Sequence, residues 1–346
     1  MSVLVRDDHE LAADRAAVEA ALAAFLGDRT DELAALGVPE FATVGHGFLK
    51  GGKRLRPTLC CRGWRAAGGE GPLPHRVAAV AASLELFHAF ALVQDDVMDD
   101  SDTRRGEPTA HRAFAGVLAG RSRARELGAD AAILLGDLLL SWSYDLLYEA
   151  ECPPPVWRLL RAMHAETLTG QYLDLTGTLT DGVERALRVG ELKTAAYTTR
   201  RPLQAGALLA GADQNVVAVL GEVGALLGEA FQLRDDLLGT FGDPSTTGKP
   251  VLDDLREGRN TTLLAVARHH ATSEHRAALD RMVADKTPDP VLLHAILTAT
   301  SARDRVERMI ATRHDQAKAL LAGPPLSPAR TSLLGRLITT IVYRDH

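Results

Sequence analysis

The sequence has few cysteines and no excess of positive charge. Its 346 residues include three cysteines, Cys60, Cys61 and Cys152, too few for the disulfide framework of a secreted domain. The 39 basic and 45 acidic residues give a net charge of −6, so the chain as a whole is a poor binder of polyanions. We therefore expect no nucleic-acid partner, and any bound anion must be held by a local site.

Long hydrophobic runs are also scarce. Acids interrupt the first ten residues, where a signal peptide needs an apolar stretch, and no cleavage site follows a hydrophobic run. The most apolar window, residues 77–93, contains Glu85 and His88 and is at the short limit for crossing a bilayer. We expect it to form a buried helix in a cytoplasmic protein without an integral membrane segment.

Strand-like alternation is nearly absent, whereas apolar residues recur every three or four positions, which predicts an all-α fold. The 46% of hydrophobic and 24% of charged residues are typical of a globular protein with a sizeable core. Glycine- and proline-rich breaks at 68–74, 152–155, 242–250 and 323–328 are too short for domain linkers, so residues 1–346 are predicted to form one domain, a helical bundle. The predicted helices are 8–26, 31–48, 54–67, 73–100, 109–118, 129–149, 154–176, 182–198, 201–211, 216–241, 250–271, 273–285, 290–301, 303–321 and 326–343.

A run of acids closes the helix predicted at 73–100. Asp95 and Asp99 are one turn apart, on one face and about 6 Å apart along the axis. Their repulsion, roughly 3 kcal/mol at an effective dielectric constant near 20, and the helix dipole both oppose ionisation without a cation. Oxygen ligands without His or Cys select Mg²⁺, which bridges carboxylates to substrate phosphate. A solvated acidic helix end is the alternative.

A second acidic pair, Asp235 and Asp236, stands among large apolar residues, where an unpaired carboxylate is costly. Gln232 is one turn earlier, so an amide and two carboxylates share a face. Basic residues stand elsewhere, in the segment 50–57, at Arg104 and Arg105, and at Lys193. Two acidic sites with separate cationic sites suggest two phosphorylated ligands and a bridging metal.

This ordered set of motifs resembles the trans-isoprenyl diphosphate synthases of the polyprenyl synthetase family. The similarity extends over about residues 40 to 270. It is carried by GGKRLRP (51–57), DDVMD with the following RRG (95–106), LGDLLL (135–140), KT (193–194), FQLRDDLL (231–238) and GKP (248–250).

The resemblance implies an all-α fold around a deep central cavity, the isoprenoid synthase fold, in a homodimer. It also implies head-to-tail condensation of isopentenyl diphosphate with an allylic diphosphate, with three Mg²⁺ ions in each active site. By position, the metal ligands are Asp95, Asp99 and Asp235, assisted by Asp96 and Asp236. Contacts to the allylic diphosphate fall on Arg104, Lys193 and Lys249, and the isopentenyl diphosphate site falls on Lys53, Arg56, His88 and Arg105. Lys193, Thr194 and Gln232 form the catalytic set, the last two near the nascent cation.

Two positions depart from the family pattern. Gly239 replaces the Asp that usually ends the second acidic motif, and Asp243 is a partial substitute whose direction the Gly242 turn leaves open. Arg259 stands where the family often has Lys, and a planar guanidinium does not replace an ammonium neutrally. We still expect the enzyme to be active.

Several alternatives stay open. A terpene cyclase would leave the segment 51–57 and Arg105 unexplained, and a silent regulatory subunit would not need both acidic motifs. His88 is also compatible with a core histidine. Phe90 with Ala91 before the first motif resembles the pattern of enzymes that make geranylgeranyl diphosphate; farnesyl diphosphate and longer products are the alternatives, with the floor of the tail site at Phe87 or Trp142.

Overall fold

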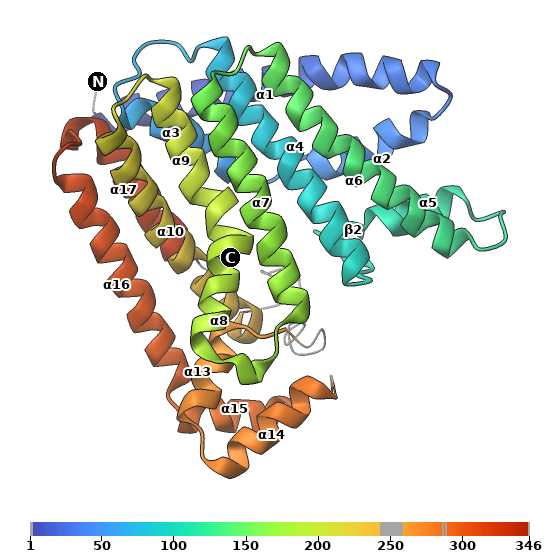
Figure 1. The fold of residues 1–346 in the computed structure, drawn as a ribbon, viewed down its shortest axis with the longest axis vertical. Coiled ribbons are helices and arrows are strands. Elements are labelled where there is room, and N and C mark those ends of the chain that lie inside the picture. The colour runs from blue at the N-terminus through green and yellow to red at the C-terminus, as the bar shows by residue number, and fades with distance from the viewer. Residues whose placement is uncertain (1–2, 243–258, 286, 288, 345–346) are drawn as a thin grey trace. The chain divides into compact units, whose positions relative to one another are not determined.

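The computed structural model describes residues 3–242, 259–285, 287 and 289–344, and α-helices dominate them (Figure 1). This confirms the predicted all-α class. The α-helices are α1 (Val3–Ala35), α2 (Pro39–Leu49), α3 (Leu55–Ala66), α4 (His75–Met98), α5 (Ala110–Val117), α6 (Ala124–Glu149), α7 (Pro154–Thr176), α8 (Gly182–Val189), α9 (Arg201–Leu209), α10 (Gln214–Phe241), α13 (Thr262–His270), α14 (Ser273–Ala284), α15 (Pro290–Ala299), α16 (Ala302–Ala322) and α17 (Pro328–Val342). A short 3₁₀-helix, η1 (Leu179–Asp181), a π-helix, η2 (Gly190–Arg200), and a hairpin of β1 (Thr103–Arg104) and β2 (Glu107–Pro108) complete the described elements.

The N-terminal prediction places one break wrongly: helices 8–26 and 31–48 were expected, whereas α1 continues through residues 27–30 to Ala35. Gly27 does not end α1. It lies on an exposed face, and the Arg29 guanidinium two residues later binds Glu32 at 2.8 Å and Glu149 of α6 at 2.7 Å. The break comes instead at Gly37, whose φ is +80°, followed by Pro39 at the first turn of α2, a sequence order that favours a helix end and a new start.

The predicted helix 182–198 is divided into α8 and the π-helix η2, which carries Lys193 and Thr194. Residues 250–258 of the predicted helix 250–271 lie outside the described residues, and α13 forms its last part, after the non-helical residues 259–261. The other predicted helices agree with the structure to within a few residues.

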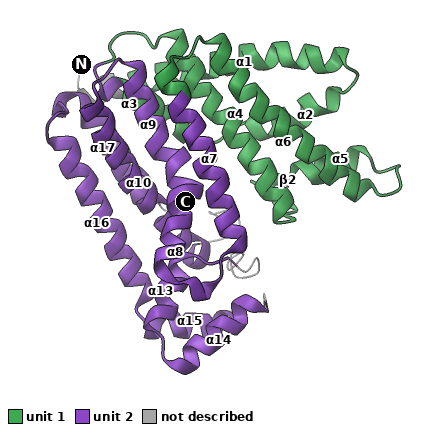
Figure 2. Cartoon of the chain, viewed as in Figure 1, with its two compact units in different colours: residues 1–64, 69–157 green, residues 65–68, 158–346 purple. Residues whose placement is uncertain are grey.

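The chain divides into two compact units, residues 1–64 with 69–157 and residues 65–68 with 158–346 (Figure 2). In the first unit, α4 packs against α1, α2, α5 and α6. Because α4 is apolar on nearly all sides, it forms the buried centre of this unit, with Val80, Leu84 and Phe87 almost inaccessible to solvent. In the second unit, α10 packs against η2, α9, α13, α16 and α17. The prediction of a single domain stays a prediction.

Glycines let the wide π-helix η2 approach its neighbours closely. A Cβ atom at Gly170 of α7 would collide with the backbone of Lys193, and one at Gly228 of α10 would collide with Ala195 and Thr199. Gly224, one turn before Gly228, faces the backbone of Arg200 in the same way. Close packing on two sides therefore fixes the segment that carries Lys193 and Thr194.

Three described helices, α4, α6 and α10, are long and apolar enough to cross a membrane by length and composition alone. In the structure, 78%, 44% and 50% of their most apolar windows are buried inside the protein. The expected lack of an integral membrane segment stays a prediction.

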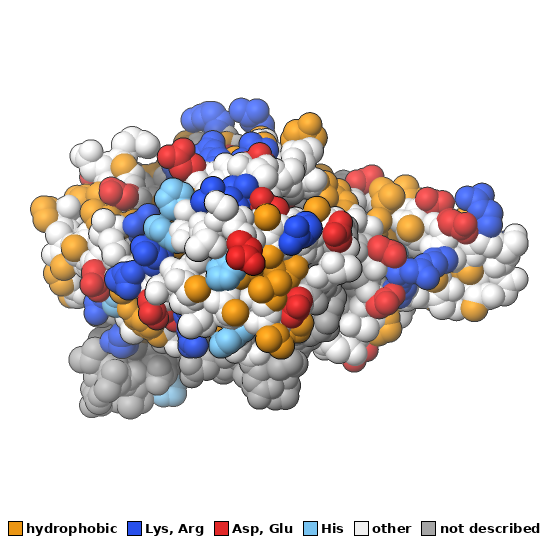
Figure 3. Space-filling model, turned by 90° about the horizontal axis from the view of Figure 1, so that it is seen from below, with side chains coloured by type: hydrophobic (Ala, Val, Ile, Leu, Met, Phe, Trp, Pro, Cys, Tyr) orange, Lys and Arg blue, Asp and Glu red, His pale blue; other side chains and the backbone are white. Residues whose placement is uncertain are grey.

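The face of the molecule seen in Figure 3 mixes both signs of charge. Among the coloured side chains in Figure 3, basic and acidic groups lie interspersed with apolar ones.

Replacing Gly228 by Ala should lower the free energy of unfolding by about 1–3 kcal/mol, because the methyl group overpacks the contact with η2. Gly27→Ala is the matched control, since no described atom lies within 4 Å of its Cβ position, and it should stabilise α1 by about 0.5–1 kcal/mol. Urea denaturation of both variants measures the difference. A Gly228→Ala protein as stable as the parent would contradict the close packing.

Candidate active site

The first acidic motif lies at the C-terminal end of α4. Asp99 is the C-cap residue, and its backbone N–H donates to the Asp95 carbonyl oxygen at 2.9 Å. The helical turn thus extends from Asp95 to Asp99, as the spacing predicts, and places the two residues on one face. The side chain of Asp95 keeps 18% of its surface exposed, so it is accessible to a ligand.

Asp96, in contrast, is buried and faces Arg104. The Arg104 Nε and Nη2 atoms donate to its carboxylate at 2.9 and 2.6 Å. Burial raises the pKa of the Asp96 carboxyl, while Arg104 acts to lower it. Nη2 of Arg104 is also 3.5 Å from Asp95, so one arginine serves both carboxylates and links the loop to the end of α4.

A tight hairpin directs the two arginines after the motif. Arg105 and Gly106 occupy its turn with φ of +54° and +81°, the pair of positive values that a type I′ turn requires. Thr103 pairs with Pro108 and Arg104 with Glu107. The turn sends Arg104 back to Asp96, and the Arg105 guanidinium lies against Gly52, 3.2 Å from the position of a Cβ there.

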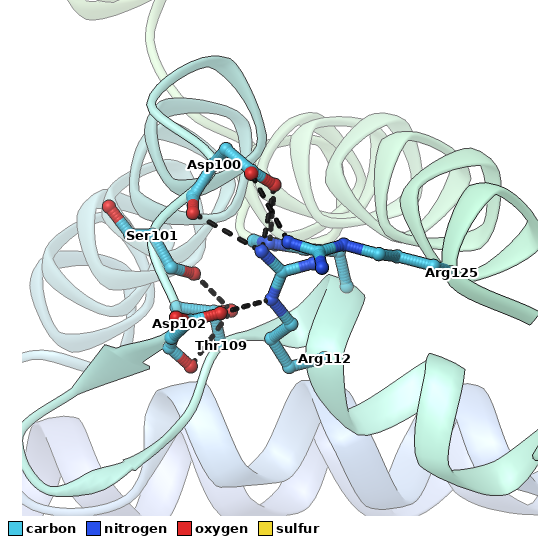
Figure 4. A network of polar contacts seen from close by, with 7 residues as sticks. Asp100, Ser101, Asp102, Thr109, Arg112 and Arg125 are labelled. Atoms are coloured by element: carbon cyan, nitrogen blue, oxygen red, sulfur yellow. Dashed lines mark hydrogen bonds and ion pairs between the residues drawn. The ribbon is translucent and has the colours of Figure 1, made fainter.

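The remaining acids of the run are held by basic residues from α5 and α6 (Figure 4). Arg112 binds Asp100 at 2.8 Å and Asp102 at 2.6 Å, and Arg125 binds Asp100 at 3.3 Å. The Thr109 hydroxyl donates to the carbonyl oxygen of Ser101 at 2.7 Å. These contacts fix the loop and engage Asp100 and Asp102 as ion-pair partners of residues on α5 and α6.

Two of the predicted isopentenyl diphosphate residues, Arg56 and Arg105, lie close enough to His88 for their charges to act on it. Burial first, and then nearby positive charge, holds the pKa of His88 well below its ordinary value. The charges are those of Arg56, Arg105, Arg104 and Arg54. His88 is therefore neutral at neutral pH and can act as a hydrogen-bonding group among cations. Lys53 precedes Arg54 in the same loop.

Sequence reasoning missed Arg54, which is buried inside this cationic cluster. Its guanidinium binds Glu19 of α1 at 2.6 Å and Glu85 of α4 at 2.9 Å, and it donates to the Leu49 carbonyl oxygen at 2.6 Å. The sequence did contain one indication of a buried cation here: Glu85 is three residues before His88, and that spacing places both on one side of α4.

In the second unit, Lys193 of η2 binds Asp174 of α7, with 2.6 Å between Nζ and Oδ2. Asp174 is one turn after Gly170, the residue that admits the backbone of Lys193. One face of α7 therefore both receives η2 and pairs with its lysine. Asp174 was also missed, because its partner is distant in sequence. Thr194 lies beside Lys193 on η2.

Gln232 and Asp236 of α10 form a second polar contact. The Gln232 Nε2 atom donates to Asp236 Oδ1 at 2.9 Å, and the Thr262 backbone N–H donates to Oδ2 at 2.8 Å. Asp236 is buried, and it joins α10 to the start of α13. The predicted face shared by the amide and this carboxylate is present.

Asp235 is more exposed than Asp236 and pairs with Arg344 after α17. The Arg344 guanidinium also lies 3.9 Å from the centroid of the Phe231 ring. Arg234 holds this end of α17, since its Nε donates to the Val342 carbonyl oxygen at 3.0 Å. Arg234, which lies inside the second acidic motif, thereby helps to bring Arg344 to Asp235, although these two residues are 109 positions apart in sequence.

The remaining predicted positions are Lys249, Asp243, Gly239 and Arg259. Lys249 and Asp243 lie outside the described residues. Gly239 lies on α10, one turn after Asp235. Arg259 precedes Asn260, whose Nδ2 donates to the Thr178 carbonyl oxygen at 2.8 Å.

The carboxylates fit the predicted metal by their chemistry. Among the described residues, no group of three or more His, Cys, Asp and Glu side chains converges as a preformed metal cage. Mg²⁺ does not need one, because it is held by one or two carboxylates, water and substrate phosphate. Asp95 and Asp99, accessible and one turn apart, supply that kind of donor set.

Comparisons with known proteins agree with this arrangement. Residues 39–300 match the model of the polyprenyl synthetase family. The geranylfarnesyl diphosphate synthase of Aeropyrum pernix is 33% identical over 86% of this chain and 92% of its own. The octaprenyl diphosphate synthase of Escherichia coli K12 is 32% identical over 85% and 87%. Other relatives are named geranylgeranyl and farnesyl diphosphate synthases.

A solved structure is similar over nearly the whole chain. It is a geranylgeranyl pyrophosphate synthase from Corynebacterium glutamicum, complexed with isoprenyl diphosphate and magnesium. It superposes with a TM-score of 0.87 at 35% identity, over 94% of this chain and 97% of that one. The described fold is that of the isoprenyl diphosphate synthases. The chain belongs to the polyprenyl synthetase family, and it is a prenyltransferase of the trans-prenyl diphosphate synthase type.

The two adjacent acids of the second motif should respond differently to substitution. Asp236→Ala leaves the Thr262 N–H and the Gln232 amide without their acceptor, so we expect a loss of about 1–3 kcal/mol in the free energy of unfolding. Asp235→Ala removes a partly exposed ion pair and should change stability by less than about 1 kcal/mol. Urea unfolding of both variants checks the order, and a larger loss in Asp235→Ala would contradict the assignment.

Proposed function

We propose that this protein catalyses the Mg²⁺-dependent head-to-tail condensation of isopentenyl diphosphate with an allylic diphosphate and releases geranylgeranyl diphosphate. The observation that carries the proposal is the cluster of arginines around neutral His88 next to an accessible pair of carboxylates, Asp95 and Asp99. One group of residues is suited to a free diphosphate and the other to a metal-bound diphosphate. A reaction between two anionic substrates requires both groups of residues.

By resemblance, Asp95 and Asp99 would be the Mg²⁺ ligands of the first acidic motif and Asp235 that of the second, for three ions in all. When bound, Mg²⁺ stabilises the negative charge that develops on the departing pyrophosphate. Lys193, with Arg104 and Lys249, would bind the allylic diphosphate. Asp174 keeps Lys193 paired and in place before substrate arrives.

Lys53, Arg56 and Arg105 would bind isopentenyl diphosphate, with His88 as a neutral hydrogen-bonding neighbour. Holding this substrate in one orientation favours attack of its double bond on the allylic cation. Apolar walls that exclude water favour the new carbon–carbon bond over hydrolysis. The reaction needs no nucleophilic side chain, and the released pyrophosphate would take the final proton.

Gln232 has a defined orientation for its role. Because its amide nitrogen donates to Asp236, its carbonyl oxygen is the end left to face the nascent allylic cation. The Thr194 hydroxyl would supply a second oxygen dipole. Both groups stabilise positive charge where it forms, without acting as nucleophiles.

Phe90 and Ala91 support the twenty-carbon product. Phe90 is buried on α4, and its ring centroid is 5.5 Å from that of Phe87. Ala91 is one turn before Asp95 and on nearly the same face, so a small side chain stands directly below the predicted metal ligands. Farnesyl and longer products are the alternatives, since the relatives include synthases of several chain lengths.

Two other functions receive less support. A terpene cyclase uses one diphosphate substrate and would not need Arg56, Arg105 and neutral His88 in one cluster. A silent regulatory subunit would not need the ion pairs that hold Arg104 and Lys193 beside carboxylates. Mg²⁺-dependent turnover by the purified chain alone separates both from the proposal.

The proposal includes a homodimer. Leu134 and Tyr148 of α6 expose 59% and 79% of their surface, and Ile133 exposes 41%. An apolar helix surface of this kind fits a second copy of the chain.

Asp95→Ala should lower kcat by several orders of magnitude without changing the unfolding midpoint, because it removes a ligand of the metal that assists ionisation. Asp102→Ala is the matched control from the same acidic run, and it should leave kcat within about threefold of the parent. Steady-state turnover at saturating Mg²⁺ measures both. Near-normal turnover in Asp95→Ala would refute its role as a metal ligand.

Substitutions at the tail site should change product length in opposite directions. Phe90→Ala removes a ring and should lengthen the product, while Ala91→Phe adds one below Asp95 and should shorten it. Mass spectrometry of the released diphosphates gives the chain length. If both variants release the parent's product, the floor of the site lies elsewhere, at Phe87 or Trp142.

A further inference from the structure

We propose that Glu85 is a positioning residue for the isopentenyl diphosphate site, a fixed buried anion that holds Arg54 and the basic segment of residues 51–56, a loop and the start of α3, against the mutual repulsion of the arginines. The inference rests on the proposed function, because it assigns a task to a residue outside the substrate-binding set. Nothing in the chemistry of condensation requires this carboxylate to touch substrate.

The contacts of Arg54 make it the anchor of the loop. Its φ of +49° lies in the left-handed region, which an arginine rarely adopts unless contacts enforce it. Four hydrogen bonds do so: two to Glu19, one to Glu85 and one to the Leu49 carbonyl oxygen at the end of α2. Because Lys53 and Arg56 flank Arg54, fixing its position fixes both.

Glu85 lies where it can act on the cluster directly. It is three residues before His88 on α4, and its side chain is 7% exposed, against 8% for Arg54. Oε2 accepts from Arg54 at 2.9 Å, whereas Oε1 is buried and has no hydrogen-bond partner among the described residues. A buried carboxylate that uses only one oxygen on Arg54 has capacity left for a further interaction.

The negative charge of Glu85 also acts on Arg105. Burial, then the charge of Arg104, lowers the pKa of Arg105; Arg54 and Arg56 act in the same direction, and Glu85 is the neighbour that opposes them. In the absence of a diphosphate, these cations repel each other. Glu85 is thus the counter-ion that keeps an empty cationic site assembled.

Glu19 provides a matched control, because it binds the same guanidinium. Its contacts to Nε and Nη2 of Arg54 are 2.6 and 3.2 Å, but its side chain is 40% exposed, so solvent screens its charge. If holding Arg54 by any carboxylate sufficed, Glu19→Gln and Glu85→Gln would have equal effects. If a buried anion inside the cluster is required, Glu85→Gln alone disturbs the site.

The test compares Glu85→Gln with Glu19→Gln in the full-length protein. We measure kcat, the KM of each substrate, and the Kd of isopentenyl diphosphate by calorimetry without primer. Glu85→Gln should raise the KM and Kd for isopentenyl diphosphate by about tenfold, with kcat and the KM for the primer within about twofold. Glu19→Gln should leave all four values within about twofold.

Three results would overturn the inference: equal increases in both KM values, a lower kcat with an unchanged Kd, or the same effect in Glu19→Gln. If Glu85→Gln does not fold, Arg54→Lys replaces it. Lysine keeps the positive charge but lacks the guanidinium fork that reaches both carboxylates. The same selective tenfold rise is expected of it, and parent values would refute the anchor.

Arg56→Leu separates failure of the inference from failure of the proposed site. If Arg56→Leu weakens binding of isopentenyl diphosphate and Glu85→Gln does not, the site stands and the positioning role is wrong. If neither variant weakens binding, the site assignment itself is wrong, and the inference fails with it.

Discussion

Three basic residues near the two acidic motifs and the cluster around His88 are held by counter-ions on other elements, and the local geometry depends on these pairs. Arg104 is fixed by Asp96, Lys193 by Asp174, and Arg54 by Glu85 with Glu19. A diphosphate-binding site must collect like charges before its ligand arrives, which costs free energy in a partly buried place. Pairing these three cations with fixed carboxylates offsets part of that cost and holds their side chains in place.

The same principle distinguishes the two acids that begin each motif. The second acid, Asp96 or Asp236, is buried and bonded within the protein, to Arg104 in one motif and to Gln232 and the Thr262 N–H in the other. The first acid, Asp95 or Asp235, remains more accessible. Two adjacent carboxylates on a helix point in directions about 100° apart, so one can brace the structure while its neighbour meets a ligand.

Much of the fold could be predicted from the sequence, because helices leave a strong periodic signal. The positions of α4, α7 and α16 followed from apolar spacing and from the glycine and proline breaks. The continuous α1 did not, since it runs on past residue 26, where Arg29 pairs with Glu32 and with Glu149 of the distant α6. The π-helix η2 could not be predicted either, because its width depends on glycines in α7 and α10 that are close only in space.

Site residues could be predicted where they form a local motif, as Asp95 and Asp99 do. They could not be predicted where the two residues of an ion pair are far apart in sequence. Asp174 and Lys193 are 19 residues apart, Arg54 and Glu85 31, and Asp235 and Arg344 109.

The most direct test of the account is mass analysis of the products that the purified full-length chain makes from isopentenyl diphosphate with dimethylallyl, geranyl or farnesyl diphosphate in Mg²⁺. The account predicts a twenty-carbon diphosphate from each primer and none when the metal is chelated. A cyclic hydrocarbon, or no consumption of isopentenyl diphosphate with any primer, would contradict it.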